Sequence, residues 1–179
     1  PFWITETSVP GNGDVMRGWS EPRQARDGAL MIMQALELGV DRLFWHTLKD
    51  GPNQGKNPFS SNGMYRCDNW SRPSGPGAME CQSWSEKPVG RMYRLLSEAL
   101  DGYQSTEALP GGKGWRIKRS GRSDALVLQP GSGSYNAGKT LGASTLYVWD
   151  LVEESGDDPT LSSGSVTLGN DPLLVTSER

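Results

Sequence analysis

The chain has 179 residues, 23 of them glycine and 12 proline, and a formal net charge of −3. That length suits one ordinary domain or two small ones. No apolar run approaches the ~20 residues that cross a bilayer, which excludes a membrane span. The slight acidity and the lack of a basic stripe exclude general nucleic-acid binding, because neutralising phosphates requires clustered Lys and Arg.

The first residues, Pro1 to Glu6, form an apolar run with no initiating Met and no leader. Such a run is typical of the interior of a chain. We therefore expect a fragment or processed piece of a longer protein, with any targeting segment upstream.

The first 47 residues predict a strand, a helix and a second strand. Residues 2–6 are aromatic and β-branched, as in a buried strand. Ser20 suits the N-cap of a helix whose apolar residues recur at helical spacing up to Gly39. Residues 41–47 read as the second strand. This order predicts parallel strands joined by a right-handed crossover.

Residues 49–86 read as one long loop, rich in Gly, Pro, Ser and Asn and longer than ordinary connections. Cys67 and Cys81 lie inside it. A disulfide between them would stabilise the fold by about 3 kcal/mol, because it would restrict the conformations of the unfolded chain. That bond suits a secreted or periplasmic protein, and the alternative is two unrelated thiols in a cytosolic enzyme.

The pattern changes near residue 102. Residues 88–100 carry one apolar helical stripe that ends before Gly102. Residues 103–179 show short alternating segments separated by Gly- and Pro-rich turns, which predicts a small antiparallel β-sandwich. We therefore expect two domains, 1–102 and 103–179.

Glu6 and Trp45 are the strongest candidates for a site. Each stands near the C-terminal end of a predicted parallel strand, where barrel enzymes carry their functional residues. Two-residue alternation puts both side chains inward, so we expect them to line one cavity. A carboxylate facing an indole is typical of a sugar site. The alternative is that Glu6 caps a neighbouring element and Trp45 belongs to the core.

Four segments of the chain match a known family pattern in their order and spacing: Trp3–Thr7, Pro22–Ala25, Ala35–Trp45 and Lys87–Leu96. Together they resemble the last quarter of a clan A glycoside hydrolase, with families 39 and 5 the most similar. The resemblance implies the final strands and helices of a (β/α)8 TIM barrel followed by an appended β-sandwich, an α/β plus all-β fold. In those enzymes the Glu of a W-x-T-E-T segment is the nucleophile, and the aromatic residue that ends the next strand forms the floor of the sugar subsite.

The resemblance implies a retaining mechanism in which Glu6 attacks the sugar and a second carboxylic acid protonates the leaving oxygen. In the family that acid belongs to an Asn-Glu-Pro segment, which would lie upstream of this chain. Glu21-Pro22 imitates the motif, but a helix cap with an acidic first turn explains it better. The missing barrel strands would come from the upstream part of the same protein, so this chain alone would be inactive.

Other residues are weaker candidates for substrate binding. His46 follows Trp45, and a structural role is the more frequent one for a lone histidine. Trp19 could stack on a sugar ring, and Asp50 could bind a hydroxyl. The resemblance also implies a cis peptide bond between Trp45 and His46. Two Cys and one His cannot build a zinc site unaided, and nothing indicates a cofactor.

Three hypotheses therefore stand at this point. The first is a fragment of a secreted, periplasmic or cell-surface glycoside hydrolase that cleaves O-glycosidic bonds in a poly- or oligosaccharide, with carbohydrate as its partner. The second is a non-catalytic carbohydrate-binding or surface-structural protein that keeps the same framework. A third hypothesis is an unrelated small α/β binding module that folds by itself.

Overall fold

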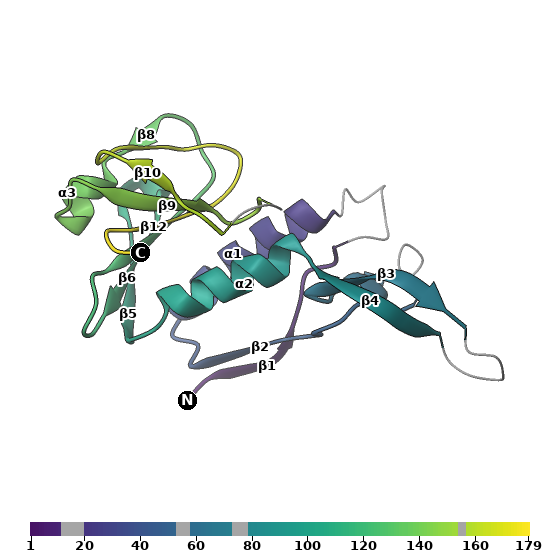
Figure 1. The fold of residues 1–179 in the computed structure, drawn as a ribbon. Coiled ribbons are helices and arrows are strands. Elements are labelled where there is room, and N and C mark those ends of the chain that lie inside the picture. The colour runs from purple at the N-terminus through teal and green to yellow at the C-terminus, as the bar shows by residue number, and fades with distance from the viewer. Residues whose placement is uncertain (12–19, 53–57, 73–78, 154–156) are drawn as a thin grey trace.

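The computed structural model describes residues 1–11, 20–52, 58–72, 79–153 and 157–179. Two long helices contact a parallel pair of strands on one side and an antiparallel sheet on the other (Figure 1). The first half of the chain supplies the parallel pair and the helices. Its elements are β1 (Trp3–Thr7), α1 (Glu21–Glu37), β2 (Arg42–Trp45) and α2 (Pro88–Ala99).

The predicted βαβ unit is confirmed. Strands β1 and β2 are parallel, with Trp3 opposite Arg42 and Ile4 opposite Leu43. Ser20 caps α1 by accepting a hydrogen bond from the backbone N–H of Arg23 at 3.3 Å. The cap satisfies an N–H group that has no partner inside the helix.

The second half of the chain forms a six-stranded antiparallel sheet in the order β10-β9-β12-β7-β6-β5. The helix α3 and the pair β8–β11 lie on its far side. The bounds are β5 (Tyr103–Ala108), β6 (Gly114–Arg119), β7 (Ala125–Leu128), β8 (Ser134–Tyr135), α3 (Ala137–Leu141), β9 (Leu146–Asp150), β10 (Thr160–Ser162), β11 (Val166–Thr167) and β12 (Leu173–Thr176).

Strand β7 shows how the sheet is covered on both faces, since all four of its residues are buried. Ala125 and Val127 belong to a core cluster shared with α1 and α2. Leu126 and Leu128 belong to a second cluster with Ala137 and its neighbours. Because side chains alternate between the faces of a strand, β7 joins two cores that lie on opposite sides of one sheet.

The expected TIM barrel fragment with an appended β-sandwich is wrong. The described residues consist mostly of strands in several small sheets with only three α-helices, and they show no succession of helices around a barrel. Helices α1 and α2 pack on the antiparallel sheet, so its inner face meets helices and not a second large sheet. An apolar helical stripe can be buried by either arrangement, so the pattern of the helices could not test the barrel that the resemblance implied.

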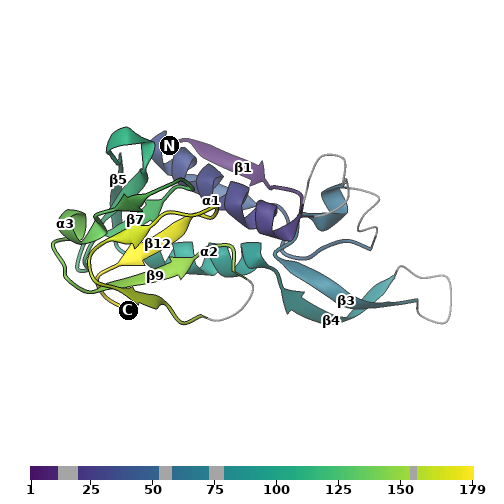
Figure 2. The same ribbon diagram turned by 90° about the horizontal axis from the view of Figure 1, so that it is seen from above.

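The segment expected to be one long loop contains a β-hairpin, so that expectation is also wrong. Strands β3 (Tyr65–Ser71) and β4 (Glu80–Glu86) are antiparallel, and a short 3₁₀ helix (Pro58–Ser61) precedes them. The hairpin projects beyond the end of the helices, away from the six-stranded sheet (Figure 1, Figure 2). The disulfide Cys67–Cys81 is confirmed, with Cα atoms 5.7 Å apart across the two strands.

A further 3₁₀ turn (Pro110–Gly112) connects β5 to β6. None of the helices in the described part of the chain has the length and apolar character needed to cross a membrane.

Candidate functional site

The carboxylate of Glu6 and the imidazole of His46 lie together at the C-terminal ends of β1 and β2. Glu6 Oε1 is 3.6 Å from His46 Nδ1, and the two side chains are 70% and 49% exposed. The backbone N–H of His46 donates to the carbonyl of Thr7 at 2.8 Å, so His46 continues the parallel pairing beyond β2. An open carboxylate at this end of parallel strands is available to a ligand.

A bulge in β1 decides which way Glu6 faces. From Ile4 to Thr7 the strand advances three residues, while its partner advances only two, from Leu43 to Trp45. One extra residue therefore interrupts the alternation of side chains. Thr7 reaches the helix layer, where its hydroxyl contacts the sulfur of Met31 at 3.0 Å, and Glu6 remains exposed.

Glu6 and Trp45 stand on adjacent parallel strands at the same end, as predicted, but the indole of Trp45 packs against helix α1. The indole ring packs on Gly28 of α1, where an added Cβ atom would lie only 3.1 Å from it. Its Nε1–H donates to the carbonyl oxygen of Asn62 at 2.9 Å. Trp45 is thus a half-buried contact between β2 and the helices. A cavity shared by Trp45 and Glu6 stays a prediction.

The predicted cis bond between Trp45 and His46 is wrong in detail. A cis peptide bond is present, but it joins His46 to Thr47, one residue later. The predicted candidate Trp19 lies outside the described residues.

Asp50 is buried, which is a poor position from which to bind a sugar hydroxyl. Both of its carboxylate oxygens are 3.2 Å from Lys87 Nζ, and Oδ1 accepts from the backbone N–H of Gly63 at 2.7 Å. Burial raises the pKa of Asp50, although Lys87 opposes this change. Burial likewise lowers the pKa of Lys87, with Asp50 opposing it.

Lys87 was missed at the sequence level, although the sequence does contain a signal. It directly precedes Pro88, at the N-terminus of α2, where the helix dipole disfavours a cation. A lysine there requires a compensating partner, and Asp50 is the partner that the fold supplies. Gln24 and Asn62, which are also buried beside this pair, carry no comparable signal.

Glu21 takes the structural role expected of a first-turn acidic residue. Its Oε2 accepts from Arg66 Nη1 at 2.7 Å, which ties α1 to β3. Trp70 and Trp84 of the hairpin pack edge to face, with ring centroids 6.0 Å apart, and Lys49 Nζ lies 4.7 Å from the Trp84 ring. These aromatic residues therefore serve as packing groups of the hairpin.

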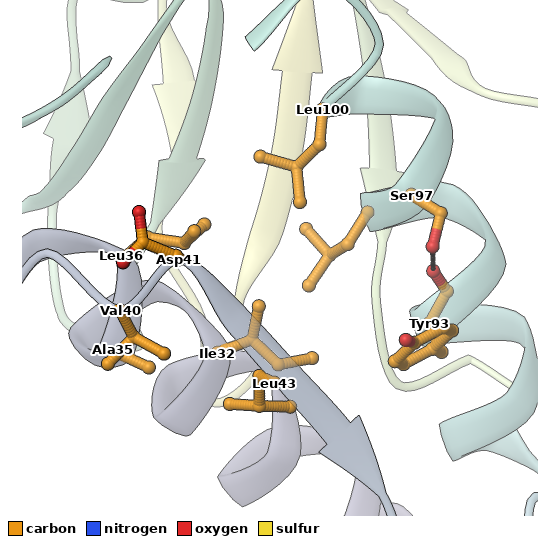
Figure 3. Close-up of a pocket in the computed structure, with 10 residues that line it drawn as sticks. Ile32, Ala35, Leu36, Val40, Asp41, Leu43, Tyr93, Ser97 and Leu100 are labelled. Carbon is orange, nitrogen blue, oxygen red and sulfur yellow. Dashed lines mark hydrogen bonds between the residues drawn. The ribbon is translucent and has the colours of Figure 1, made fainter. Parts of the chain in front are cut away.

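A cavity lies away from Glu6, between α1, α2 and β2 (Figure 3). Its volume is about 180 Å³, and its walls are largely aliphatic. The lining residues are Ile32, Ala35, Leu36, Val40, Asp41, Leu43, Tyr93, Leu96, Ser97 and Leu100.

In the described part of the chain, no three His, Cys, Asp or Glu side chains converge in a way that could hold a metal ion. No protein family, curated protein or solved structure matches the chain.

Proposed function

We propose that the chain carries the nucleophile of a retaining glycoside hydrolase that cleaves O-glycosidic bonds in a poly- or oligosaccharide. The observation that carries the proposal is the exposed Glu6 carboxylate at the end of a parallel strand, 3.6 Å from His46, which directly follows the neighbouring strand. The W-x-T-E-T segment around Glu6 supplies the reaction class by resemblance.

In the proposed reaction a Glu6 oxygen attacks the anomeric carbon as the bond to the leaving oxygen breaks, and a second carboxylic acid gives that oxygen its proton. Water then attacks the glycosyl–enzyme ester, the second group takes the proton of the water, and Glu6 is regenerated.

We assign the acid/base carboxylate to a segment of the polypeptide outside these 179 residues. The disulfide between Cys67 and Cys81 supports a secreted, periplasmic or cell-surface location, since such bonds persist in oxidising compartments.

Covalent trapping tests the nucleophile directly. The full-length polypeptide that contains this sequence is incubated with a panel of 2-deoxy-2-fluoroglycosyl fluorides and digested with trypsin. We expect the label in the peptide that ends at Arg17, where fragment ions separate Glu6 from Asp14. A label on any other residue would contradict the assignment.

Substitution of the nucleophile gives the matching kinetic prediction. Glu6→Gln keeps the shape of the side chain but removes its nucleophilic oxygen, so turnover of an activated aryl glycoside should fall by at least ~1000-fold while sugar binding survives. Glu98→Gln is the control, because Glu98 is an exposed carboxylate on α2. Unchanged turnover in Glu6→Gln would overturn the role of Glu6.

Added azide reports the stereochemistry. In Glu6→Ala the anion can enter the vacated space and attack the anomeric carbon, which gives a glycosyl azide of inverted configuration. If the wild-type polypeptide shows no turnover or trapping over a broad glycoside panel, and Glu6→Ala gives no azide product, the non-catalytic carbohydrate-binding function replaces the enzymatic one.

A further inference from the structure

The buried pair of Asp50 and Lys87 holds one short segment of the chain, Ser61–Met64. Lys87 Nζ donates to the carbonyl of Ser61 at 2.9 Å, and Asp50 receives the N–H of Gly63. The side chains of Lys87 and Asp50 are 0% and 2% exposed. Two charges removed from water to this degree are costly unless every contact between them and their neighbours is made.

The same segment contacts the regions where both parallel strands end. The carbonyl of Asn62 accepts the indole N–H of Trp45, the last residue of β2. Its Nδ2 donates to Ser8 Oγ at 2.8 Å, directly after the end of β1. Asn62 therefore holds Trp45, the neighbour of His46, through its backbone carbonyl, and Ser8, the neighbour of Thr7, through its side chain.

Close packing leaves this segment little room to move. A Cβ atom added to Gly63 would lie 2.4 Å from the backbone of Lys49 and Asp50. A Cβ atom on Gly11 would lie 2.3 Å from Gln24 Oε1 and 2.7 Å from Lys87 Nζ. Because even one added carbon atom finds no room at these positions, a shift of Lys87 or Asp50 is passed on to the segment.

We propose that Lys87 and Asp50 are positioning residues, which hold Ser61–Met64 and through it set the placement of Glu6 and His46. This inference rests on the proposed function, because the placement matters for catalysis only if Glu6 is the nucleophile. The pair touches neither Glu6 nor His46. It acts through Asn62, Trp45 and Ser8.

The test compares Lys87→Met, which keeps the length of the side chain without its charge, with the control Lys118→Met. Lys118 belongs to the exposed ion pair with Glu107 on β5 and β6, away from the strand ends. In the full-length polypeptide we expect Lys87→Met to lower kcat by roughly 10- to 100-fold with little change in KM, because small displacements of a reacting group have effects of this size. Lys118→Met should leave both unchanged.

A second measurement does not depend on activity. With ¹⁵N-labelled tryptophan and histidine, the Trp45 indole N–H and the His46 ring signals are followed by NMR, assigned with Trp45→Phe and His46→Gln. We expect both to shift in Lys87→Met and to stay in place in Lys118→Met. A folded Lys87→Met with wild-type signals for both residues would overturn the proposal.

If Lys87→Met fails to fold, Asp50→Asn/Lys87→Met replaces it. The double variant carries no unpaired buried charge and keeps an oxygen for the Gly63 N–H. We expect it to fold with shifted Trp45 and His46 signals, and wild-type signals would overturn the proposal. Shifted signals in a polypeptide whose wild type neither turns over nor traps any glycoside would uphold the positioning and reject the proposed function.

Discussion

At the scale of single residues, three local interactions hold the first half of the chain: the Ser20 cap, the disulfide between Cys67 and Cys81, and the pair of Asp50 and Lys87. The Ser20 cap and the disulfide between Cys67 and Cys81 were both predicted, and both are confirmed. The orientation of Glu6 relative to Trp45 was not, because alternation assumes a regular strand and β1 contains an extra residue. The partnership of Lys87 with Asp50 spans 37 residues and depends on the tertiary fold.

The Asp50–Lys87 pair makes stability depend on pH in a specific way. Because the pKa of Asp50 is raised in the folded protein, Asp50 contributes stability at pH values below 3.8, its usual pKa. This contribution is lost as the pH rises through the higher pKa of the folded protein. Because the pKa of Lys87 is lowered in the folded protein, Lys87 contributes stability at pH values above 10.5, its usual pKa. This contribution is lost as the pH falls through the lower pKa of the folded protein. Glu21 opposes the change in Lys87, and Arg66 favours it.

The free energy of unfolding of wild type, relative to that of Asp50→Asn/Lys87→Met, is therefore lowest at neutral pH. We expect the double variant to be as stable as wild type or up to ~4 kcal/mol more stable at pH 7. The difference should shrink as the pH falls from the raised pKa of Asp50 toward 3.8, and as the pH rises from the lowered pKa of Lys87 toward 10.5. Urea unfolding at several pH values measures this. A difference that does not change with pH would contradict the assigned directions of the pKa shifts.

At the scale of elements, the sequence predicted the βαβ order and the helix that begins at Pro88, since apolar periodicity is strong in both. It missed the hairpin β3–β4. Those strands carry Asp68, Asn69, Gln82 and Ser83, which are poor strand formers, and their pairing depends on the cross-strand disulfide and the packed indoles.

The contact between α1 and β2 depends on a glycine. A Cβ atom on Gly28 would lie 3.0 Å from Met92 and 3.1 Å from Trp45, so a larger side chain must displace both. We expect Gly28→Leu to lower the free energy of unfolding by about 1–3 kcal/mol. Gln34→Leu places the same residue on the exposed face of α1 and is the control. Urea unfolding followed by fluorescence compares the two, and equal effects would refute the steric explanation.

At the scale of the whole molecule, the sequence predicted an antiparallel second half but not how it meets the first. Helices α1 and α2 contribute to the same core cluster as β6 and β7, so residues on both sides of the expected boundary at 102/103 pack together. Helical periodicity shows that a face is apolar without showing which partner covers it. That choice requires knowledge of the full set of elements.

A shared core predicts cooperative unfolding of both halves. Leu96 of α2 is 1% exposed within the common cluster, so Leu96→Ala should cost about 2–5 kcal/mol. In native-state hydrogen exchange we expect the protection of the helices and of β6 and β7 to fall by the same amount. Leu161→Ala, at a 69% exposed position, should change neither. Full protection of β6 and β7 alongside weakened helices would show that the halves unfold separately.

The bulge in β1 shifts the two-residue alternation of side chains along the strand by one residue. Each residue after the bulge points its side chain to the face opposite to the one it would occupy in a regular strand, although the composition of the strand is unchanged. Two sequences that differ by the insertion of one residue between Ile4 and Thr7 would align almost perfectly and yet offer opposite faces to a ligand. The chemistry available at this edge is therefore encoded in the spacing of the residues as much as in their identity.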